Sequence, residues 1–185
     1  FVMQMADGTL PMEKFRYYML QDYLYLKDYV KIFAAIIQKA DDFEQIRFLS
    51  GELANTIGET FRTHLPYMQR LGVTEDEIRR ARPHIDNSAY SHYMLCEAQA
   101  GDVLTGLVTL LNCSWSYAYI AQEMAARYPD ALQNEHYGAW FAGYGFGGVP
   151  PDESGAHRPD RRARRGHRRA DDTASVRDLP NVLPV

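Results

Sequence analysis

An acid lies within a row of apolar residues near the start of the chain, where a carboxylate is unusual. The acid is Asp22, and Tyr25 lies on the same helical face three residues later. The apolar members of the row, at helical spacing, are Phe15, Met19, Leu26, Val30 and Phe33. Because burying a carboxylate costs several kcal/mol unless it is hydrogen-bonded or paired, a partner must satisfy Asp22. That partner is either a neighbouring tyrosine or backbone amide in the core, or a polar ligand in an aromatic pocket.

A second residue that could do chemistry is the thiol of Cys113. Tyr117 follows one helical turn later and shares its face. A lone thiol is usually an inert core residue, and it becomes a nucleophile only where a base, a hydrogen bond or a helix N-terminus favours the thiolate. Cys113 is expected in mid-helix, where the helix dipole helps little, so both interpretations stay open. For Cys96 a structural core thiol is the better interpretation.

The elements that position these residues are all expected to be helices. No stretch alternates as a strand would, and Pro, Gly or capping residues divide the chain into helical segments. A turn is expected at Asp7-Gly8, and Pro66 is expected to kink the second helix. The expected helices cover approximately residues 11–39, 42–71, 74–82, 87–100, 102–128 and 135–143. The fold class is therefore all-α.

Helix caps give the sharpest boundaries in this pattern. Thr74 and Glu77 have the spacing of a capping box, in which each side chain bonds the backbone of the other residue. Asp102 is expected to cap the helix that carries Cys113. Asn87 or Ser88 is expected to cap the preceding helix.

Composition narrows the possible functions. The chain has 185 residues, of which 46% are hydrophobic and 24% charged, as in one globular domain. A net charge of −4 argues against general binding to nucleic acid or to an anionic membrane. The 13 tyrosines suit the walls of a site for a small polar aromatic ligand, although tyrosines also fill cores and interfaces. No signal peptide and no run of about 18 apolar residues is visible, so a cytoplasmic protein is expected.

The character of the chain changes after Gly145. Residues 146–185 are rich in Pro, Gly and Arg, with a basic run at 161–169, and large apolar residues almost vanish until Val176. Three interpretations stay open: a basic arm for an anionic partner, a solvated disordered tail, or an out-of-frame translation that replaces the natural end. The last predicts that the DNA beyond codon 145 encodes an amphipathic helix in a shifted frame.

Several motifs, taken together in order and spacing, resemble the TenA/THI-4 family of thiaminase II or aminopyrimidine aminohydrolase proteins. The motifs are Asp7–Pro11, Phe15–Leu26, Ala89–Met94, Leu110–Tyr117 and Tyr144-Gly145, and the likeness covers about residues 1–145. The resemblance implies a helical bundle of the haem-oxygenase type, usually a homotetramer. It also implies that this chain is shorter than the family at both ends.

The resemblance further implies a reaction that needs no metal or cofactor. The family hydrolyses 4-amino-5-aminomethyl-2-methylpyrimidine to the hydroxymethylpyrimidine in thiamin salvage, and it also cleaves thiamin at its methylene bridge. By motif position Cys113 matches the nucleophile and Asp22 matches the acid that hydrogen-bonds the aminopyrimidine. Tyr25 matches an aromatic residue packed on the ring. The tyrosines that match the rest of the pocket are Tyr90, Tyr117 and Tyr144.

One departure from the family pattern limits the expected activity. The family carries a catalytic glutamate on a late helix, and that region falls after residue 145, where Glu153 stands in an unmatched context. Since general acid–base help is worth roughly 10²- to 10⁴-fold in rate, we expect a crippled enzyme that still binds the pyrimidine. The alternative function is a non-catalytic, pyrimidine-binding or regulatory protein of the same fold.

Two further alternatives come from other classes of protein. A di-iron oxidase needs carboxylate and histidine ligands at repeated spacing; Glu52, Glu59 and His64 share one expected helix, but their steps of seven and five residues do not form Glu-x-x-His. Direct DNA binding would need a basic helix-turn-helix face, which the ordered part lacks.

Overall fold

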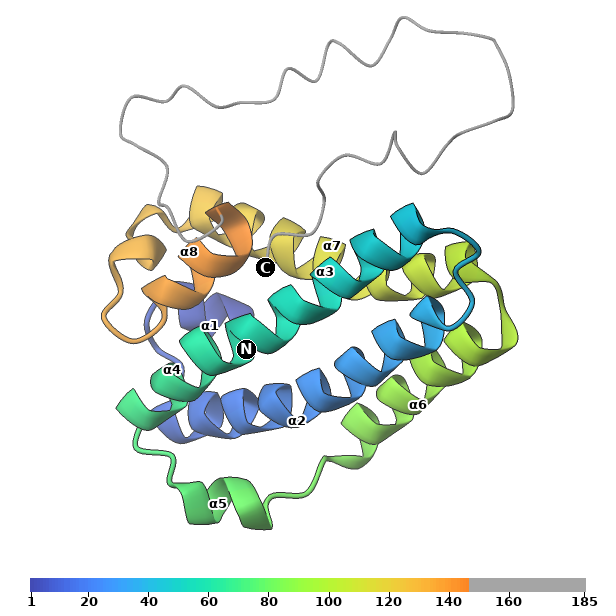
Figure 1. Ribbon diagram of the computed structural model, residues 1–185. Coiled ribbons are helices and arrows are strands. Elements are labelled where there is room, and N and C mark those ends of the chain that lie inside the picture. Colours follow the sequence, from blue (N-terminus) through green and yellow to red (C-terminus); the bar gives the residue numbers. More distant parts are fainter. Residues whose placement is uncertain (147–185) are drawn as a thin grey trace, which may run out of the picture.

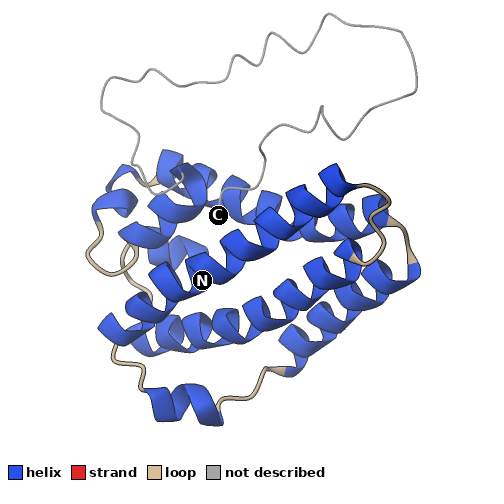
Figure 2. Ribbon diagram, viewed as in Figure 1, coloured by secondary structure: helices blue, strands red, loops and turns tan. Residues whose placement is uncertain are grey.

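The computed structural model describes residues 1–146, and every regular element in them is helical (Figures 1 and 2). The helices are α1 Val2–Ala6, α2 Met12–Ile37, α3 Phe43–Glu59, α4 Leu65–Arg70, α5 Glu75–Arg80, α6 Ile85–Ala100, α7 Val103–Arg127 and α8 Gly138–Phe146. A π-helical turn, Thr60–His64, joins α3 to α4, and a 3₁₀ segment, Pro129–Gln133, lies between α7 and α8. The expected all-α class is confirmed, and the predictions for the tail lie outside the described residues.

Most expected helices are present with small shifts at their ends. The expected second helix is continuous through α3, the π-turn and α4, and Pro66 lies in the first turn of α4, directly after the π-turn. The last expected helix begins three residues late, at Gly138. Helix α1 and the 3₁₀ segment were not anticipated. The expected turn at Asp7-Gly8 is confirmed, because Gly8 has the positive φ of 77° that glycine tolerates best.

Two predicted caps are confirmed. Thr74 and Glu77 form a reciprocal capping box at the start of α5. Asp102 accepts a hydrogen bond from the backbone N–H of Thr105 at 2.8 Å, at the start of α7. These caps satisfy backbone donors that the first helical turn leaves unpaired.

The predicted cap of α6 is wrong, and its error has a physical cause near the site. The helix begins at Ile85 with His84 as its cap, two residues before Asn87. Both ends of the Asn87 amide are engaged elsewhere: its N–H donates to the backbone carbonyl of Gln21 at 2.8 Å, and its Oδ1, the atom that a cap would use, accepts from the Ser91 hydroxyl at 3.5 Å. Asn87 therefore ties α6 to α2 beside Asp22.

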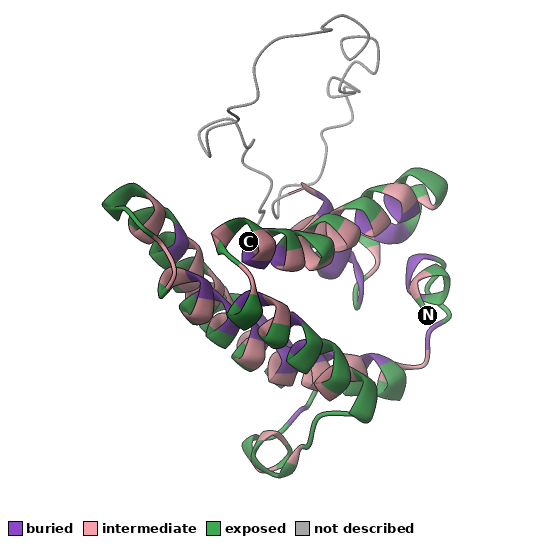
Figure 3. Ribbon diagram, turned by 90° about the vertical axis from the view of Figure 1, so that its right-hand side faces the viewer, coloured by how far each residue is buried: buried purple, intermediate pink, exposed green. Residues whose placement is uncertain are grey.

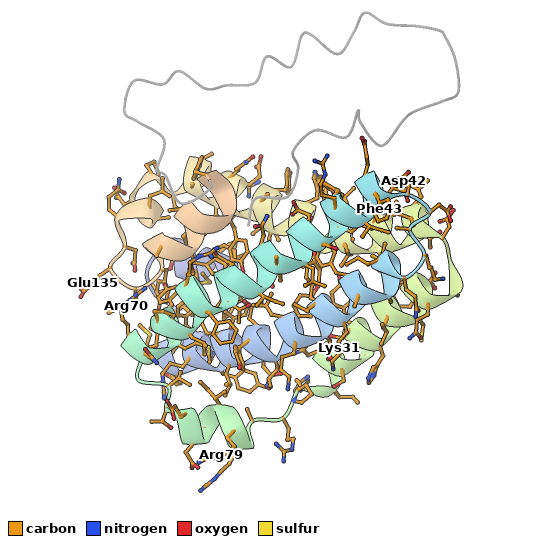
Figure 4. The ribbon with its side chains drawn as sticks, in the orientation of Figure 1. Lys31, Asp42, Phe43, Arg70, Arg79 and Glu135 are labelled. Atoms are coloured by element: carbon orange, nitrogen blue, oxygen red, sulfur yellow. The ribbon has the colours of Figure 1, made fainter. Side chains whose placement is uncertain are left out.

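Helix α2 is the centre of the bundle and packs against α3, α6 and α7 (Figure 1). Gly106 lets α7 approach closely, because a Cβ there would lie 2.4 Å from the side chain of Ile36. Helix α5 stands apart at the bottom of Figure 4, where Arg79 points away from the bundle, whereas Asp42 and Phe43 mark the far end of α3. The long helices carry both buried and exposed residues, as amphipathic helices do (Figure 3).

The hydrophobic core has two clusters, and α2 runs through both. Phe15 and Met19 belong to the first cluster, with residues of α1, α4, α7 and α8. Tyr25 and Tyr29 belong to the second, with residues of α3, α6 and α7. Asp22 lies on α2 between these two sets, so the buried acid sits where the clusters meet.

The buried stripe of α2 differs in part from the expected one. Leu26 and Val30 are half-buried, whereas Tyr25 and Tyr29 are buried. After Asp22 the buried face of α2 therefore includes Tyr25 and Tyr29, which pack with residues of α3, α6 and α7.

Helix α7 also presents an apolar row to the outside. The row comprises Leu104, Val108, Leu111, Trp115 and Tyr119, all exposed in this structure. By length and composition α7 is the one helix of the described residues that could cross a membrane. A helix of a soluble bundle can have the same length and composition, and α7 packs against α2, α6 and α8. Its apolar character therefore does not identify a membrane span.

Candidate active site

A small cavity of about 100 Å³ lies between α2, α3, α7 and α8. Its aromatic walls are Tyr25, Tyr29, Phe33, Tyr117 and Tyr144. Its polar lining includes three carboxylates and a histidine, namely Asp22, Glu52, Glu59 and His64, together with the thiol of Cys113. The cavity therefore combines flat apolar walls with a negatively charged floor, which suits a small polar aromatic ligand with a positive group.

A second, more open groove meets this cavity at Cys113. Four residues line both spaces: Asp22, Tyr25, Cys113 and Tyr117. The groove adds polar side chains from α2, α6 and α7, namely Gln21, Asn87, Tyr90 and Ser116. The thiol thus lies between an enclosed acidic cavity and an open, amide-lined groove that gives access to it.

All six side chains predicted for the site surround these two spaces. Tyr144 lines the inner cavity, and Tyr90 lines the outer groove. The Tyr90 ring stacks on Tyr25, with centroids 5.9 Å apart and planes inclined by 10°. The geometry brings the predicted residues together, while their individual roles stay predictions.

The buried carboxylate of Asp22 is satisfied by a histidine. His64 Nε2 lies 3.1 Å from Asp22 Oδ2, and the two side chains are only 11% and 5% exposed. Neither of the partners anticipated in the core, a tyrosine or a backbone amide, fills this role. Asp22 also lines the cavity, so it is a paired core acid and a pocket acid at once.

Charge on the pair is favoured by its surroundings. Burial alone would lower the pKa of His64, but the hydrogen bond and charge of Asp22, with the charge of Glu59, raise the pKa above its ordinary value. Among the described residues, Asp22, His64 and Ser91 are the buried polar side chains. The His64–Asp22 pair is thus a buried, hydrogen-bonded acid–base pair on the cavity wall, and it is an ion pair when His64 is protonated.

The π-turn places His64 on that wall. Glu52, Thr56 and Glu59 follow one another at steps of four and three residues, which keeps them on one α-helical face. An α-helix would bring residue 62 or 63 to the same face next. Because a π-turn bonds residue i to i+5, it carries one extra residue and brings His64 there instead.

The surroundings of Cys113 favour its neutral thiol. Burial raises the pKa of Cys113 to about 11, the Asp22 charge adds to the rise, and an interaction with the Tyr25 side chain opposes it. Burial also raises the pKa values of Tyr25, Tyr117 and Tyr144, so their hydroxyls keep their protons. Catalysis by Cys113 would therefore require the ligand or a base to favour the thiolate.

Glu52, Glu59 and His64 were considered in the sequence only as metal ligands. In the described residues no group of three His, Cys, Asp or Glu side chains is arranged to hold a metal ion. The step of seven between Glu52 and Glu59 was a usable signal for one helical face. The step of five residues from Glu59 to His64 was interpreted as if the α-helix were uninterrupted, so it did not indicate that the two residues share a face.

Comparison with known proteins agrees with this geometry. The sequence profile of the TENA/THI-4/PQQC family matches residues 1–151. The chain belongs to this family. Aminopyrimidine aminohydrolases of Helicobacter pylori and Halalkalibacterium halodurans are 37% and 35% identical to it over 144 residues. These alignments cover 78% of this chain and 66% and 64% of the two relatives, so the chain spans about two thirds of their length.

Solved structures of TenA proteins share the fold. A TenA homologue from P. horikoshii matches with a TM-score of 0.69 and 32% identity, covering 77% of this chain and 66% of that one. A TenA family transcription regulator from Silicibacter matches with a TM-score of 0.71 and 26% identity, covering 78% of this chain and 63% of that one. The expected TenA-type helical bundle is confirmed.

Proposed function

We propose that this chain binds an aminopyrimidine and hydrolyses it through Cys113, as an aminopyrimidine aminohydrolase of the thiaminase II type. The observation that carries the proposal is the shared lining of one tyrosine-walled cavity by the Cys113 thiol and the Asp22 carboxylate. Similar curated members of the family are aminopyrimidine aminohydrolases. The predicted substrate is 4-amino-5-aminomethyl-2-methylpyrimidine, with thiamin as a second substrate of the same site.

Each part of the ligand has a matching group in the cavity. Asp22 accepts a hydrogen bond from the exocyclic amine, and the ring lies between tyrosine faces. The aminomethyl group is a cation at neutral pH, and Glu52 and Glu59 supply negative charge for it. Burial raises the pKa of Glu52, which suits a group that exchanges protons.

The proposed reaction proceeds by covalent catalysis. Cys113 loses its proton to a cavity carboxylate and adds to the electron-poor ring, forming a carbon–sulfur bond. The carbon–nitrogen bond of the cationic aminomethyl group then breaks, and the group leaves as ammonia with the three hydrogens that it already carries, while the carboxylic acid keeps the proton that it later returns to Cys113. Water adds to the methylene carbon and gives up a proton, and the carbon–sulfur bond breaks to restore the aromatic ring. The net change converts the aminomethyl group and water into a hydroxymethyl group and ammonia.

A second candidate function is pyrimidine binding without turnover. The high pKa of the Cys113 thiol favours it, since little thiolate is present in the empty cavity. The position of the family's late-helix glutamate lies outside the described residues, and within them Glu52 and Glu59 are cavity carboxylates that could carry protons. Binding without ammonia release would identify this alternative.

Ammonia release from 4-amino-5-aminomethyl-2-methylpyrimidine tests the proposal. We expect slow release that disappears in Cys113→Ser and persists in the matched variant Cys96→Ser, because Cys96 is exposed and lines neither space. Equal release from both variants would contradict the role of Cys113. The predicted homotetramer and cytoplasmic location belong to the same proposal.

A further inference from the structure

His64 takes no part in the bond changes proposed above, yet it is the buried basic group of the site, and the hydrogen bond and charge of Asp22 raise its pKa. His64 is 9% exposed, and its ring extends from the π-turn to Asp22 on α2. The other ring nitrogen, Nδ1, is buried and makes no hydrogen bond. The nearby backbone carbonyl of Glu59 favours the charged ring without meeting hydrogen-bond geometry. A buried ring nitrogen without a hydrogen bond destabilises the fold, so its presence suggests that His64 has a functional role.

The contact with Asp22 is directional. His64 Nε2 meets one oxygen, Oδ2, at 3.1 Å. Among residues 1–146, His64 is the one side chain that hydrogen-bonds Asp22. The carboxylate is therefore oriented by one partner, while its other oxygen, Oδ1, remains available to a ligand in the cavity.

We propose that His64 is a positioning residue that holds the Asp22 carboxyl group in a fixed orientation, so that Oδ1 accepts a hydrogen bond from the exocyclic amine of the aminopyrimidine. This inference deepens the proposed function and rests on it. The π-turn is the element that makes it possible, since an uninterrupted α-helix would direct residue 62 or 63, Arg or Thr, toward Asp22. A residue that contacts a ligand-binding group without touching the ligand orients that group, and the protein fold keeps the residue itself in place.

The positioning depends on pH because His64 titrates. Besides Asp22 on α2, His64 Nε2 lies 3.5 Å from the Tyr144 hydroxyl on α8, and the charge of Glu59 on α3 acts on the ring. The two cavities that His64 lines also carry other charged or titratable groups, namely Tyr25 and Tyr29 from α2, Glu52 from α3, Tyr67 and Arg70 from α4, and Cys113 and Tyr117 from α7. The carboxylates of Asp22 and Glu59 favour the charged ring. Ligand binding should therefore be strongest while His64 is protonated and should weaken as the pH rises through its raised pKa.

The test is calorimetric binding of 4-amino-5-hydroxymethyl-2-methylpyrimidine, the unreactive product, to the full chain between pH ~6 and ~9. His64→Leu removes the donor and the charge, whereas His64→Gln keeps an amide donor near the Nε2 position without the charge. His92→Gln is the matched control, because His92 is exposed and lines neither space. Titration of the ligand is common to all variants and cancels in affinity ratios.

We expect His64→Leu to raise Kd about tenfold or more at pH ~6, as for a lost hydrogen bond to a charged group. His64→Gln should keep the affinity within about threefold and should flatten the dependence of the affinity ratio on pH. Wild-type affinity and pH dependence in folded His64→Leu would overturn the proposal. So would a pH dependence in His64→Gln equal to that of wild type.

A ligand-free measurement separates this inference from the proposed function. NMR titration of the His64 ring should give a pKa above about 6.5 in wild type and a lower value in Asp22→Asn. If wild type binds no pyrimidine, the proposed function fails, and this titration alone decides whether Asp22 holds His64 charged. An unchanged His64 titration in Asp22→Asn would overturn the pairing on which the inference depends.

Discussion

Asp22 on α2 and Cys113 on α7 line the same two spaces and oppose each other electrostatically. The negative charge of Asp22 raises the pKa of Cys113, in addition to the larger effect of burial. The acid that is predicted to bind the ligand therefore also disfavours the thiolate of the predicted nucleophile. A ligand whose amine donates to Asp22 would reduce this effect, so binding and activation of the thiol are coupled.

The first prediction concerns this opposition. In Asp22→Asn the pKa of Cys113 should fall, and its alkylation by iodoacetamide at pH ~8.5 should accelerate about threefold or more, since only the thiolate reacts. Site-resolved mass spectrometry measures the rate, and the exposed Cys96 provides an internal control in the same sample. An unchanged ratio of Cys113 to Cys96 labelling would show that Asp22 does not act on the thiol.

The second prediction concerns Tyr25. Its side chain interacts with the thiol and lowers the pKa of Cys113 against the effect of burial, while its hydroxyl donates to Met94 Sδ at 3.6 Å. Tyr25→Phe should therefore slow Cys113 alkylation about threefold or more, the effect of one lost hydrogen bond. Tyr93→Phe on α6 is the control, because Tyr93 is 62% exposed. Equal rates in the two variants would contradict the contact.

The third prediction links the buried pair to stability. The pKa of His64 is raised in the folded state, so its stabilising contribution is complete below the unfolded pKa of about 6.5 and is lost as the pH rises through the folded value. His64→Leu should lower the free energy of unfolding by about 3 kcal/mol at pH ~6, the effect of leaving a buried charge unpaired. The loss should be smaller at pH ~9.

Urea unfolding of wild type and His64→Leu at both pH values measures this difference. His92→Gln, at an exposed position, should show little change at either pH. A loss in His64→Leu that is equal at the two pH values would mean that the ring contributes packing but no charge.

The fourth prediction concerns the exposed apolar row on α7. Trp115 is 56% exposed and Leu104 is 62% exposed, and such a row favours burial between subunits. Light scattering after size exclusion should give four times the chain mass, consistent with the predicted homotetramer. Trp115→Glu should reduce that mass, whereas Lys31→Glu, on the exposed face of α2, should not. A monomeric wild type would contradict the predicted assembly.

Much of the fold could be predicted because local signals mark its helix ends. Asp102 and the pair Thr74 and Glu77 cap helices where their side chains can satisfy unpaired backbone donors. The start of α6 could not be predicted in the same way. Asn87 is a good local cap, but a tertiary contact with Gln21 engages its amide. The tertiary contact overrides the local capping preference of Asn87, and a short segment of sequence does not reveal such a contact.

The candidate site was predictable where side chains follow ordinary helical spacing. Cys113 and Tyr117 are one turn apart, and both line the cavity. His64 was missed as a partner of Asp22 because 42 residues separate them and a π-turn shifts the helical phase. A π-turn has no strong sequence signal, so helical spacing gave no indication that His64 shares a face with Glu52 and Glu59.

The most direct test of the account is protection of Cys113 by the pyrimidine. Iodoacetamide labelling at pH ~8.5 would be followed at both cysteines, with and without saturating 4-amino-5-hydroxymethyl-2-methylpyrimidine. We predict that the bound ligand shields the thiol and slows the labelling of Cys113 by about tenfold or more, leaves the labelling of Cys96 unaffected, and loses its effect in Asp22→Asn. Ligand-independent labelling of Cys113 in folded wild-type protein would contradict an aminopyrimidine site in this cavity.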